Sequence, residues 1–563
     1  MDTNANLPRV IAAVTCDLEC SPLGTASRLL SLWGGHTVLR QTITRLRQVQ
    51  GVGSIALLAP LAQHEAIKKE LADIADLTIL EHHPRAAALN AQVQAGRAWN
   101  LEAWRGGAGQ WTVFDEDYHP QSIAAAVRQL AADHVLVIPA HAALLDVHLT
   151  QQLLEHHLHK NQEMRLTYTP AAPGISGLVL RGDIALEMGE VGKRGGGMPG
   201  HLLGYDPREP TFDTLIRAAC MQVDPALSKI PNRFLLDTDR AWHLAQRLEK
   251  AGPFDCSATM ATAAYQMRPA GADHALGAEG DAFKHPREVE IELTARRLTQ
   301  PVGGVPATIR QGRSELDAAT WQQWWNGQAL ADDLVVTLGG DGDPLLYPDL
   351  LAVLRAMRQA GVRNIHLQTD LLEGQALLAA AVAEGLVDVV GVTFWGDDAA
   401  TYRHISGVDG YAQVLENLEG LLKLIEPSGR GLPLVIPRLL KVRETIPQME
   451  AFFDRWVLRC GWAVIDGPTD RAGAVPFAGV VEMGPPKRKP CRRIGDRLLI
   501  RSHGQAGACD QDIHGKLALG QIPAMTLEQL WRSETLHQLQ QQHAGGEWQN
   551  IVPCAQCREW FRS

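Results

Sequence analysis

Two stretches decide the fold of this chain: Glu288-Val-Glu-Ile-Glu-Leu-Thr294 and Leu334-Val-Val-Thr-Leu-Gly-Gly-Asp-Gly-Asp-Pro344. Both contain apolar or alternating runs that predict β-strands, and the second ends in glycines and acids. A helix is predicted over residues 349–360, and a third apolar run extends from Asn364 to Leu367. A strand, a helix and a strand at this spacing predict a βαβ unit with parallel strands. Proteins built from such units bind their ligands at the C-terminal ends of the strands.

The second half of the chain continues this alternation. Further strands are predicted over residues 387–394, 433–438 and 462–465, with helices ending at 383 and spanning 411–425 and 451–456. Their order and spacing resemble the partial (β/α) barrel of radical S-adenosylmethionine enzymes that carry a C-terminal iron–sulfur extension of the SPASM type. The segment Trp395-Gly-Asp-Asp-Ala-Ala-Thr-Tyr-Arg-His-Ile-Ser-Gly407 is similar to one in that family. The resemblance implies the fold of this region more than its chemistry.

The ligands of the catalytic cluster are missing from this barrel. In the radical enzymes the first strand leads into a Cys-x₃-Cys-x₂-Cys loop, and the best register places Arg297, Pro301 and Gly304 there. Reductive cleavage of S-adenosylmethionine needs a cluster with one open iron, normally held by those three cysteines. An arginine puts a fixed positive charge at this point, and proline and glycine offer no side-chain donor. We therefore expect a degenerate barrel that does not itself cleave S-adenosylmethionine.

The turn after the second strand retains part of a cofactor site. In the family, a Gly-Gly-Glu-Pro segment holds the amino group of S-adenosylmethionine. The resemblance implies that this group is bound by Gly340, Asp341, Gly342, Asp343 and Pro344, with Asp343 at the acid position but one methylene shorter. Glycines here also suit a tight turn out of a barrel strand, so the residues alone leave S-adenosylmethionine binding open.

The C-terminal tail contains four cysteines in a metal-ligand pattern: Cys491, Cys509, Cys554 and Cys557. The spacing from Gly504 to Cys509 and the run Leu527-Glu-Gln-Leu-Trp531 are similar to the SPASM extension. Four thiolates in such an array complete either a [4Fe–4S] cluster or a tetrahedral zinc site, and their spacing does not separate the two. The resemblance favours the [4Fe–4S] cluster, with zinc as the alternative.

The first half of the chain shows a different α/β pattern. Strands are predicted over residues 9–15, 54–59 and 134–139, with helices over 37–49 and 123–131. This is a doubly wound, Rossmann-like pattern. Over roughly residues 8–250 it resembles the nucleotidyltransferase fold, especially sugar-type cytidylyltransferases. The resemblance is carried by Thr37-Val-Leu-Arg-Gln-Thr42 and by Arg233-Phe-Leu-Leu-Asp-Thr238.

The resemblance to nucleotidyltransferases implies a nucleotide site at the C-terminal ends of the strands. The implied residues are Gly24, Arg28, His141, Gly174 and Asp237. His141 lies near the position where the family has a metal-binding aspartate, and Asp237 is either structural or a metal ligand. The small residues around Gly174 fit a close approach to a ligand and a tight loop equally well. We expect Gly24, Arg28, His141 and Gly174 to line one pocket.

Length and composition set limits on the class of protein. At 563 residues the chain predicts two to four domains. The boundaries predicted are a nucleotidyltransferase-like domain over 1–250, a linker over 251–286, a barrel over 287–475 and a SPASM-like domain over 476–563. A net charge of −10 favours no nucleic-acid partner, and no apolar run is long enough for a membrane span. The N-terminus lacks the pattern of a signal peptide, so we expect a cytoplasmic protein.

These observations favour one function and leave two alternatives. The leading interpretation is an iron–sulfur protein with a degenerate radical-enzyme barrel that acts as a partner, carrier or electron-transfer subunit. In the second, the N-terminal domain binds a nucleotide sugar or acts as a cytidylyltransferase-type enzyme. The third is a structural scaffold stabilised by zinc. A protein partner follows from the first interpretation, and a nucleotide or nucleotide sugar follows from the second.

Overall fold

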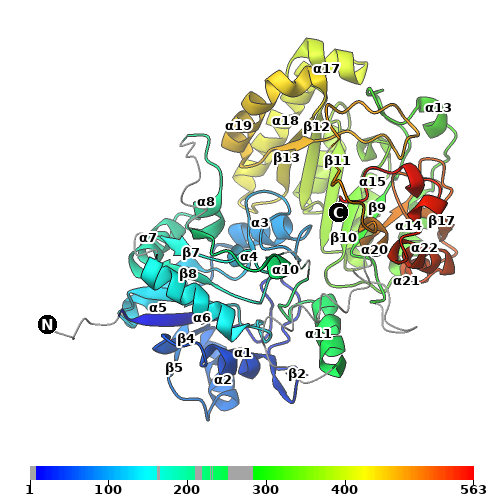
Figure 1. Ribbon diagram of the computed structural model, residues 1–563. Coiled ribbons are helices and arrows are strands. Elements are labelled where there is room, and N and C mark those ends of the chain that lie inside the picture. Colours follow the sequence, from blue (N-terminus) through cyan, green and yellow to red (C-terminus); the bar gives the residue numbers. More distant parts are fainter. Residues whose placement is uncertain are drawn as a thin grey trace. The chain divides into compact units, whose positions relative to one another are not determined.

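The computed structural model describes residues 8–160, 165–208, 219–228, 230, 232–251, 283–482 and 484–562 (Figure 1). The chain divides into two compact units, Met1–Met267 and Arg268–Ser563. The linker predicted over 251–286 lies outside the described residues except at 251 and 283–286. No helix in the described ranges is both long and apolar enough to cross a membrane.

Unit 1 (residues 1–267) is an α/β structure built on a mostly parallel sheet. The strand order is β5 (Leu77–Glu81), β4 (Ser54–Ala59), β1 (Val10–Thr15), β6 (His134–Val137), β8 (Leu178–Arg181) and β7 (Leu166–Thr167). The first four strands are parallel, whereas β8 is antiparallel to both β6 and β7. All six residues of β1 are buried, because a central parallel strand is covered on both faces. A short hairpin pairs β2 (Leu32–Trp33) with β3 (His36–Thr37).

Helices complete unit 1: α1 (Val38–Leu46), α2 (His64–Glu70), α3 (Ala87–Arg97), α4 (Val113–Glu116), α5 (Pro120–Gln129), α6 (Val147–Glu155), α7 (Gly182–Gly192), α8 (Pro199–Leu203), α10 (Pro225–Ser228) and α11 (Asp239–Ala251). Helix α1 begins after Thr37, whose side chain accepts a hydrogen bond from the backbone N–H of Arg40. Helices α5 and α7 pack at small residues, since a Cβ added at Gly189 would lie 2.4 Å from that of Ala124.

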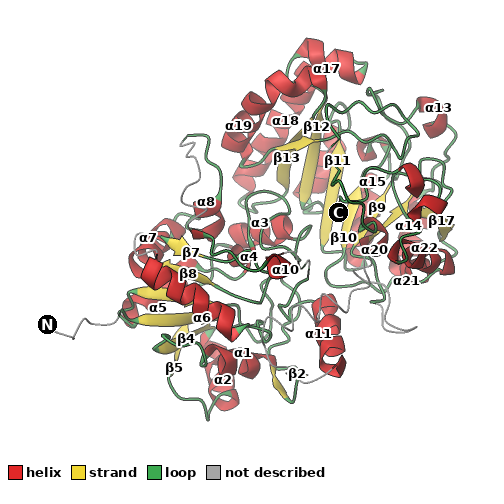
Figure 2. Cartoon of the chain, in the orientation of Figure 1, coloured by secondary structure: helices red, strands yellow, loops and turns green. Residues whose placement is uncertain are grey.

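Unit 2 (residues 268–563) contains a nine-stranded sheet (Figure 2). Six parallel strands follow one another along the chain: β9 (Glu288–Ile291), β10 (Val335–Leu338), β11 (Asn364–Thr369), β12 (Val389–Phe394), β13 (Leu434–Leu440) and β14 (Val464–Asp466). The C-terminal strand β15 (Arg497–Ile500) pairs parallel with β9. It is followed by the antiparallel strands β16 (Gln505–Gly507) and β17 (Ala518–Gln521). The cysteine-bearing tail therefore extends the sheet that begins the unit.

The helices of unit 2 are α13 (Ala307–Arg310), α14 (Ala318–Asn326), α15 (Leu350–Gln359), α16 (Gln375–Ala383), α17 (Ala399–Ser406), α18 (Tyr411–Ile425), α19 (Met449–Cys460), α20 (Arg493–Asp496), α21 (Leu527–Trp531) and α22 (Glu534–Ala544). The hydrophobic core extends from Val289 to Trp560 and includes the fully buried Trp321 and Trp325 of α14. Unit 1 has a separate core. The helices and strands expected from the sequence are present in both units, although β9 ends at Ile291 rather than Thr294.

Candidate functional site

The four C-terminal cysteines lie on short elements around the end of the sheet in unit 2. Cys491 precedes α20, Cys509 follows β16, Cys554 begins a 3₁₀ turn (Cys554–Gln556), and Cys557 ends it. All four are free thiols, and the first three are buried while Cys557 is half-buried. The backbone N–H of Cys491 donates to Nδ1 of His543 at 3.2 Å, which ties the start of this segment to α22.

Three of the four thiols lie within electrostatic range of Cys491. Burial is the largest cause of a raised pKa at each of the four, and it brings the pKa of Cys554 to about 12 and that of Cys557 to about 11. Negative charge on Cys491 adds to the raised pKa of Cys509, Cys554 and Cys557. Binding of one metal centre by this set stays a prediction. As thiols these groups keep their protons, and a bound cation would have to displace them.

The surroundings of these sulfurs suit thiolates. The backbone N–H groups of Gln511 and Glu559 donate to the sulfurs of Cys509 and Cys557, at 3.4 and 3.3 Å. Arg493 and Arg488 supply nearby positive charge that lowers the thiol pKa values. In the part of the chain that the structure describes, no three His, Cys, Asp or Glu side chains already surround one metal-ion position. A four-iron cluster binds each thiolate through a different iron, so its ligands do not share one such point.

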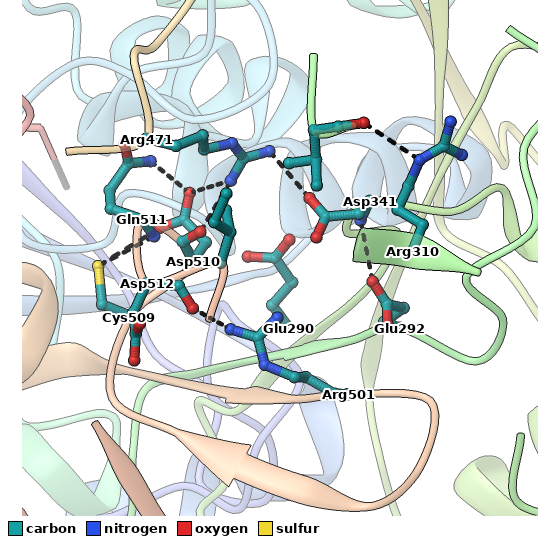
Figure 3. Close-up of polar contacts among 12 residues, drawn as sticks. Glu290, Glu292, Arg310, Asp341, Arg471, Arg501, Cys509, Asp510, Gln511 and Asp512 are labelled. Atoms are coloured by element: carbon teal, nitrogen blue, oxygen red, sulfur yellow. Dashed lines mark hydrogen bonds and ion pairs between the residues drawn. The ribbon is translucent and has the colours of Figure 1, made fainter. Parts of the chain in front are cut away.

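A chain of ion pairs connects the cysteine loop with the segments that follow β9 and β10, and Figure 3 shows its part from Asp510 through Arg471 to Asp341. Asp510, beside Cys509, pairs with Arg493 and with Arg471, the latter at 3.2 Å. Arg471 also contacts Asp341 at 3.2 Å. The chain continues through a contact of 2.8 Å between Asp341 and Arg313 and one of 2.7 Å between Arg313 and Glu292. Arginines hold the pKa of Asp510 well below its ordinary range, so it remains charged.

At the predicted cofactor turn, Asp341 and its neighbours form hydrogen bonds and ion pairs with other residues of the protein. Asp343 accepts hydrogen bonds from Thr369 Oγ1 and the N–H of Asp370 at 2.9 Å each, and from the N–H of Leu345 at 3.1 Å. Gly340 has a φ of +85°. A Cβ at Gly342 would lie 1.9 Å from the carbonyl oxygen of Thr294, so only glycine fits. Pro344 begins the 3₁₀ turn that follows. The turn is packed directly against the chain leaving β9.

Arg297 occupies the position predicted for the first cysteine of the cluster loop, and a carboxylate balances its positive charge. Its guanidinium contacts both carboxylate oxygens of Asp370, at 2.5 and 2.8 Å, and lies 5.3 Å from the centre of the Trp395 ring. Thr299 donates to the same carboxylate at 2.6 Å. The other two positions form a turn in which the N–H of Gly304 donates to Pro301 at 2.9 Å. An ion pair therefore stands at the position where the sequence resemblance predicted the first cluster ligand.

In unit 1 the loops that carry Gly24, Arg28 and His141 follow β1 and β6, which are parallel neighbours, so these loops lie at one edge of the sheet. Gly174 lies between β7 and β8, and Asp237 precedes α11. Gly24 lies in the turn from Ser21 to Thr25. Thr25 Oγ1 donates to the carbonyl of Asp237 at 2.8 Å, and Ser27 Oγ lies 3.5 Å from His141 Nε2. The structure therefore brings these loops together.

The individual side chains differ from the expectation of one common pocket. Arg28 pairs with Asp239, and the buried Asp237 pairs with Arg233, so neither charge is free. Burial lowers the pKa of His141 to about 3, which keeps the ring neutral. Gly174 packs on the backbone of Phe234 and lines a pocket of about 20 Å³, enough for about one water molecule. Gly24, Arg28 and His141 do not line that pocket, so the prediction of one common pocket is wrong.

Asp117 lines the same pocket and was not predicted. Burial raises the pKa of its carboxyl well above the ordinary value, and the nearby carboxylates of Asp237, Glu116 and Asp17 raise it further. The signal in the sequence is the acidic run Asp115-Glu-Asp117, which stands alone in an apolar region. Two of its members are structural: Asp115 caps α4, and Glu116 pairs with Arg97 and Arg233.

A family model described as the SPASM iron–sulfur cluster-binding domain matches residues 491–558, a span that contains all four cysteines. An uncharacterized protein of Treponema pallidum (strain Nichols) is 23% identical over 239 residues, which are 40% of this chain and 64% of that protein. The match therefore spans less than two thirds of that relative.

Two solved structures show a remote likeness. Streptococcus suis SuiB bound to the precursor peptide SuiA has a TM-score of 0.37 and 11% identity, over 46% of this chain and 66% of that one. A cytidylyltransferase from Leptospira borgpetersenii serovar Hardjo-bovis (strain JB197) has a TM-score of 0.33 and 9% identity, over 46% of this chain and 94% of that one. TM-scores this low do not establish a shared fold.

Proposed function

We propose that Cys491, Cys509, Cys554 and Cys557 bind a [4Fe–4S] cluster and that the protein serves as a partner, carrier or electron-transfer subunit. The observation that carries this proposal is the match of residues 491–558 to an iron–sulfur cluster-binding domain. The electrostatic effect of Cys491 on the other three thiols supports it. When bound, such a cluster supplies one-electron chemistry.

The residues around the four cysteines have defined tasks in this proposal. The N–H donors of Gln511 and Glu559 stabilise negative charge on two of the sulfurs. Arg493 and Arg488 offset the charge that four thiolates bring into a buried place. Asp510 holds Arg493 in position and is itself held by Arg471, so this charged lining is fixed from the barrel side.

The barrel, in this proposal, does not cleave S-adenosylmethionine. Arg297 and Asp370 support this part, because the guanidinium occupies the place predicted for a ligand and donates through Nε and Nη2 to both oxygens of the Asp370 carboxylate. Asp343 already accepts three hydrogen bonds from its own turn and from the end of β11, so its carboxylate is held by internal packing. The barrel then acts as a rigid support for the cysteine-bearing segment, whose strand β15 pairs with β9.

Metal analysis of protein purified without oxygen tests the proposal. We expect iron and acid-labile sulfide with broad visible absorption, and little zinc. Cys554→Ala should lose the iron, whereas Cys460→Ala, at the end of α19 in the same unit, should retain it. Zinc in place of iron would favour the structural scaffold. Iron retained in Cys554→Ala would contradict the assigned ligands.

A second candidate function concerns unit 1, where the loops after β1 and β6 meet and the buried Asp117 lines a pocket. This arrangement supports binding of a nucleotide or nucleotide sugar at that edge. Titration calorimetry with CTP and UTP in the presence of Mg²⁺ tests it. We expect binding that weakens in Arg28→Met, and no heat with either nucleotide would remove this candidate.

A further inference from the structure

A pocket of about 310 Å³ lies in unit 2 beside Cys557. Its volume is at the lower end of the range of about 300–1,000 Å³ that is typical of small-molecule sites. Lys441 and Gly467, which line it, are the first residues after β13 and β14. These strands are parallel neighbours, and the C-terminal ends of parallel strands are where α/β proteins bind ligands. The position alone therefore marks the pocket as a ligand site.

Three cationic side chains line the pocket, and two of them form ion pairs with carboxylates. Arg562 pairs with Glu559 at 2.6 Å, and Arg558 pairs with Glu482 and with Asp470, the latter at 3.4 Å. Among the residues that the structure describes, no carboxylate is within ion-pair distance of the Lys441 ammonium group. A half-buried ammonium group in a concave wall attracts an anion, because the surrounding protein screens it less than water does.

The walls of the pocket are aromatic. Phe477, Trp560 and Phe561 line it, and the rings of Trp560 and Phe561 meet edge to face at 5.8 Å. Arg558 lies 5.7 Å from the centre of the Phe477 ring, which fixes that ring from one side. Three aromatic rings in the wall, together with one cation that has no carboxylate partner, suit a ligand with a flat apolar body and one negatively charged group.

We propose that this pocket binds a small organic anion, such as an aromatic carboxylate or phosphate monoester, with Lys441 as the anchor of its charged group. The binding does not depend on a metal, although Cys557 forms part of the wall. The site is also distinct from the cofactor turn at residues 340–344, since none of those residues lines it.

Titration calorimetry on the full chain tests this proposal, with benzoate and phenyl phosphate as the probes and phenol as the uncharged comparison. We expect at least one anion to bind more tightly than phenol, and the stronger of the two identifies the charged group. Lys441→Met should weaken that binding roughly tenfold to a hundredfold, as loss of a charge-assisted hydrogen bond does. Lys441→Arg should restore most of it.

Lys423→Met is the matched control, because Lys423 is an exposed lysine on α18 that does not line the pocket. It should bind the anion as the parent protein does. Iron content measured in the same samples separates this test from that of the proposed cluster. Absence of binding by both anions, or equal binding by the parent protein and Lys441→Met, would overturn the proposal.

Discussion

Arg297 has a structural role at the scale of single residues. Its guanidinium forms an ion pair with Asp370 and a contact with the Trp395 ring. A cysteine introduced there would leave the Asp370 carboxylate buried without its charged partner. A cluster ligand at this position would therefore need changes at both residues.

Arg297→Met should destabilise unit 2 by about 3 kcal/mol, because it leaves a buried carboxylate unpaired. Thermal unfolding monitored by calorimetry measures this loss, and Arg297→Met with Asp370→Asn should recover part of it. The control is Arg355→Met, which breaks a solvent-exposed pair with Glu384 and should cost at most about 1 kcal/mol. Equal losses at the two sites would show that the Arg297 pair is not buried as described.

Glu290 gives a pH dependence at the same scale. Burial raises the pKa of its carboxyl to about 7 from an ordinary 4.5; Arg497 opposes the shift, and Asp510 and Glu288 add to it. The folded state holds this proton more tightly than the unfolded state does. The protonated carboxyl therefore stabilises the fold below pH 4.5, and this contribution to the free energy of unfolding is lost as the pH rises through about 7. The melting temperature of Glu290→Gln relative to the parent protein should therefore increase across this window. A difference that stays constant with pH would refute the shift.

Close backbone packing is the main feature at the scale of elements. Gly342 brings the turn after β10 against the carbonyl of Thr294, after β9, with no room for a side chain. Gly342→Ala should therefore lower the melting temperature of unit 2 strongly. Gly420→Ala should instead raise stability by up to about 1 kcal/mol, because Gly420 lies inside α18 with open space around it. The same melting experiment checks both, and a harmless Gly342→Ala would contradict this packing.

The elements were predictable from the sequence because hydrophobic periodicity determines them. The strands from β9 to β14 and the helices between them follow the predicted order, within a few residues at each end. The pairing of β15 with β9 was not predictable, since it joins segments about 200 residues apart with no local signal. The ion pairs of Arg297 and Arg471 could not be predicted from the sequence either, because their carboxylate partners follow other strands of the sheet.

The candidate site was predictable only in part. The four cysteines were predicted from their spacing and flanking residues, and all four lie within the span that matches an iron–sulfur cluster-binding domain. Their role as ligands stays a prediction. In unit 1 the predicted residues come from loops that meet, yet Arg28 and Asp237 are paired internally. Such pairing depends on how the loops pack, which the sequence pattern does not record. The binding role of these residues remains a prediction.

At the scale of the whole molecule, the two units have separate hydrophobic cores. The predicted barrel and the predicted SPASM-like domain both belong to unit 2 and share one sheet. The proposed cluster should therefore stabilise unit 2 as a whole and leave unit 1 unchanged. Calorimetry before and after removal of iron by a chelator should show two transitions, of which one shifts down. A shift of both transitions would show that the units unfold together.

The most direct test of the central claim is an assay for 5′-deoxyadenosine. The protein, loaded with iron and sulfide, is reduced with dithionite in the presence of S-adenosylmethionine and without oxygen. We predict no 5′-deoxyadenosine above the level of a protein-free control, because Arg297, Pro301 and Gly304 provide no ligands for a cluster beside the predicted cofactor turn. Stoichiometric 5′-deoxyadenosine, from the parent protein or from Cys554→Ala, would contradict the proposed function.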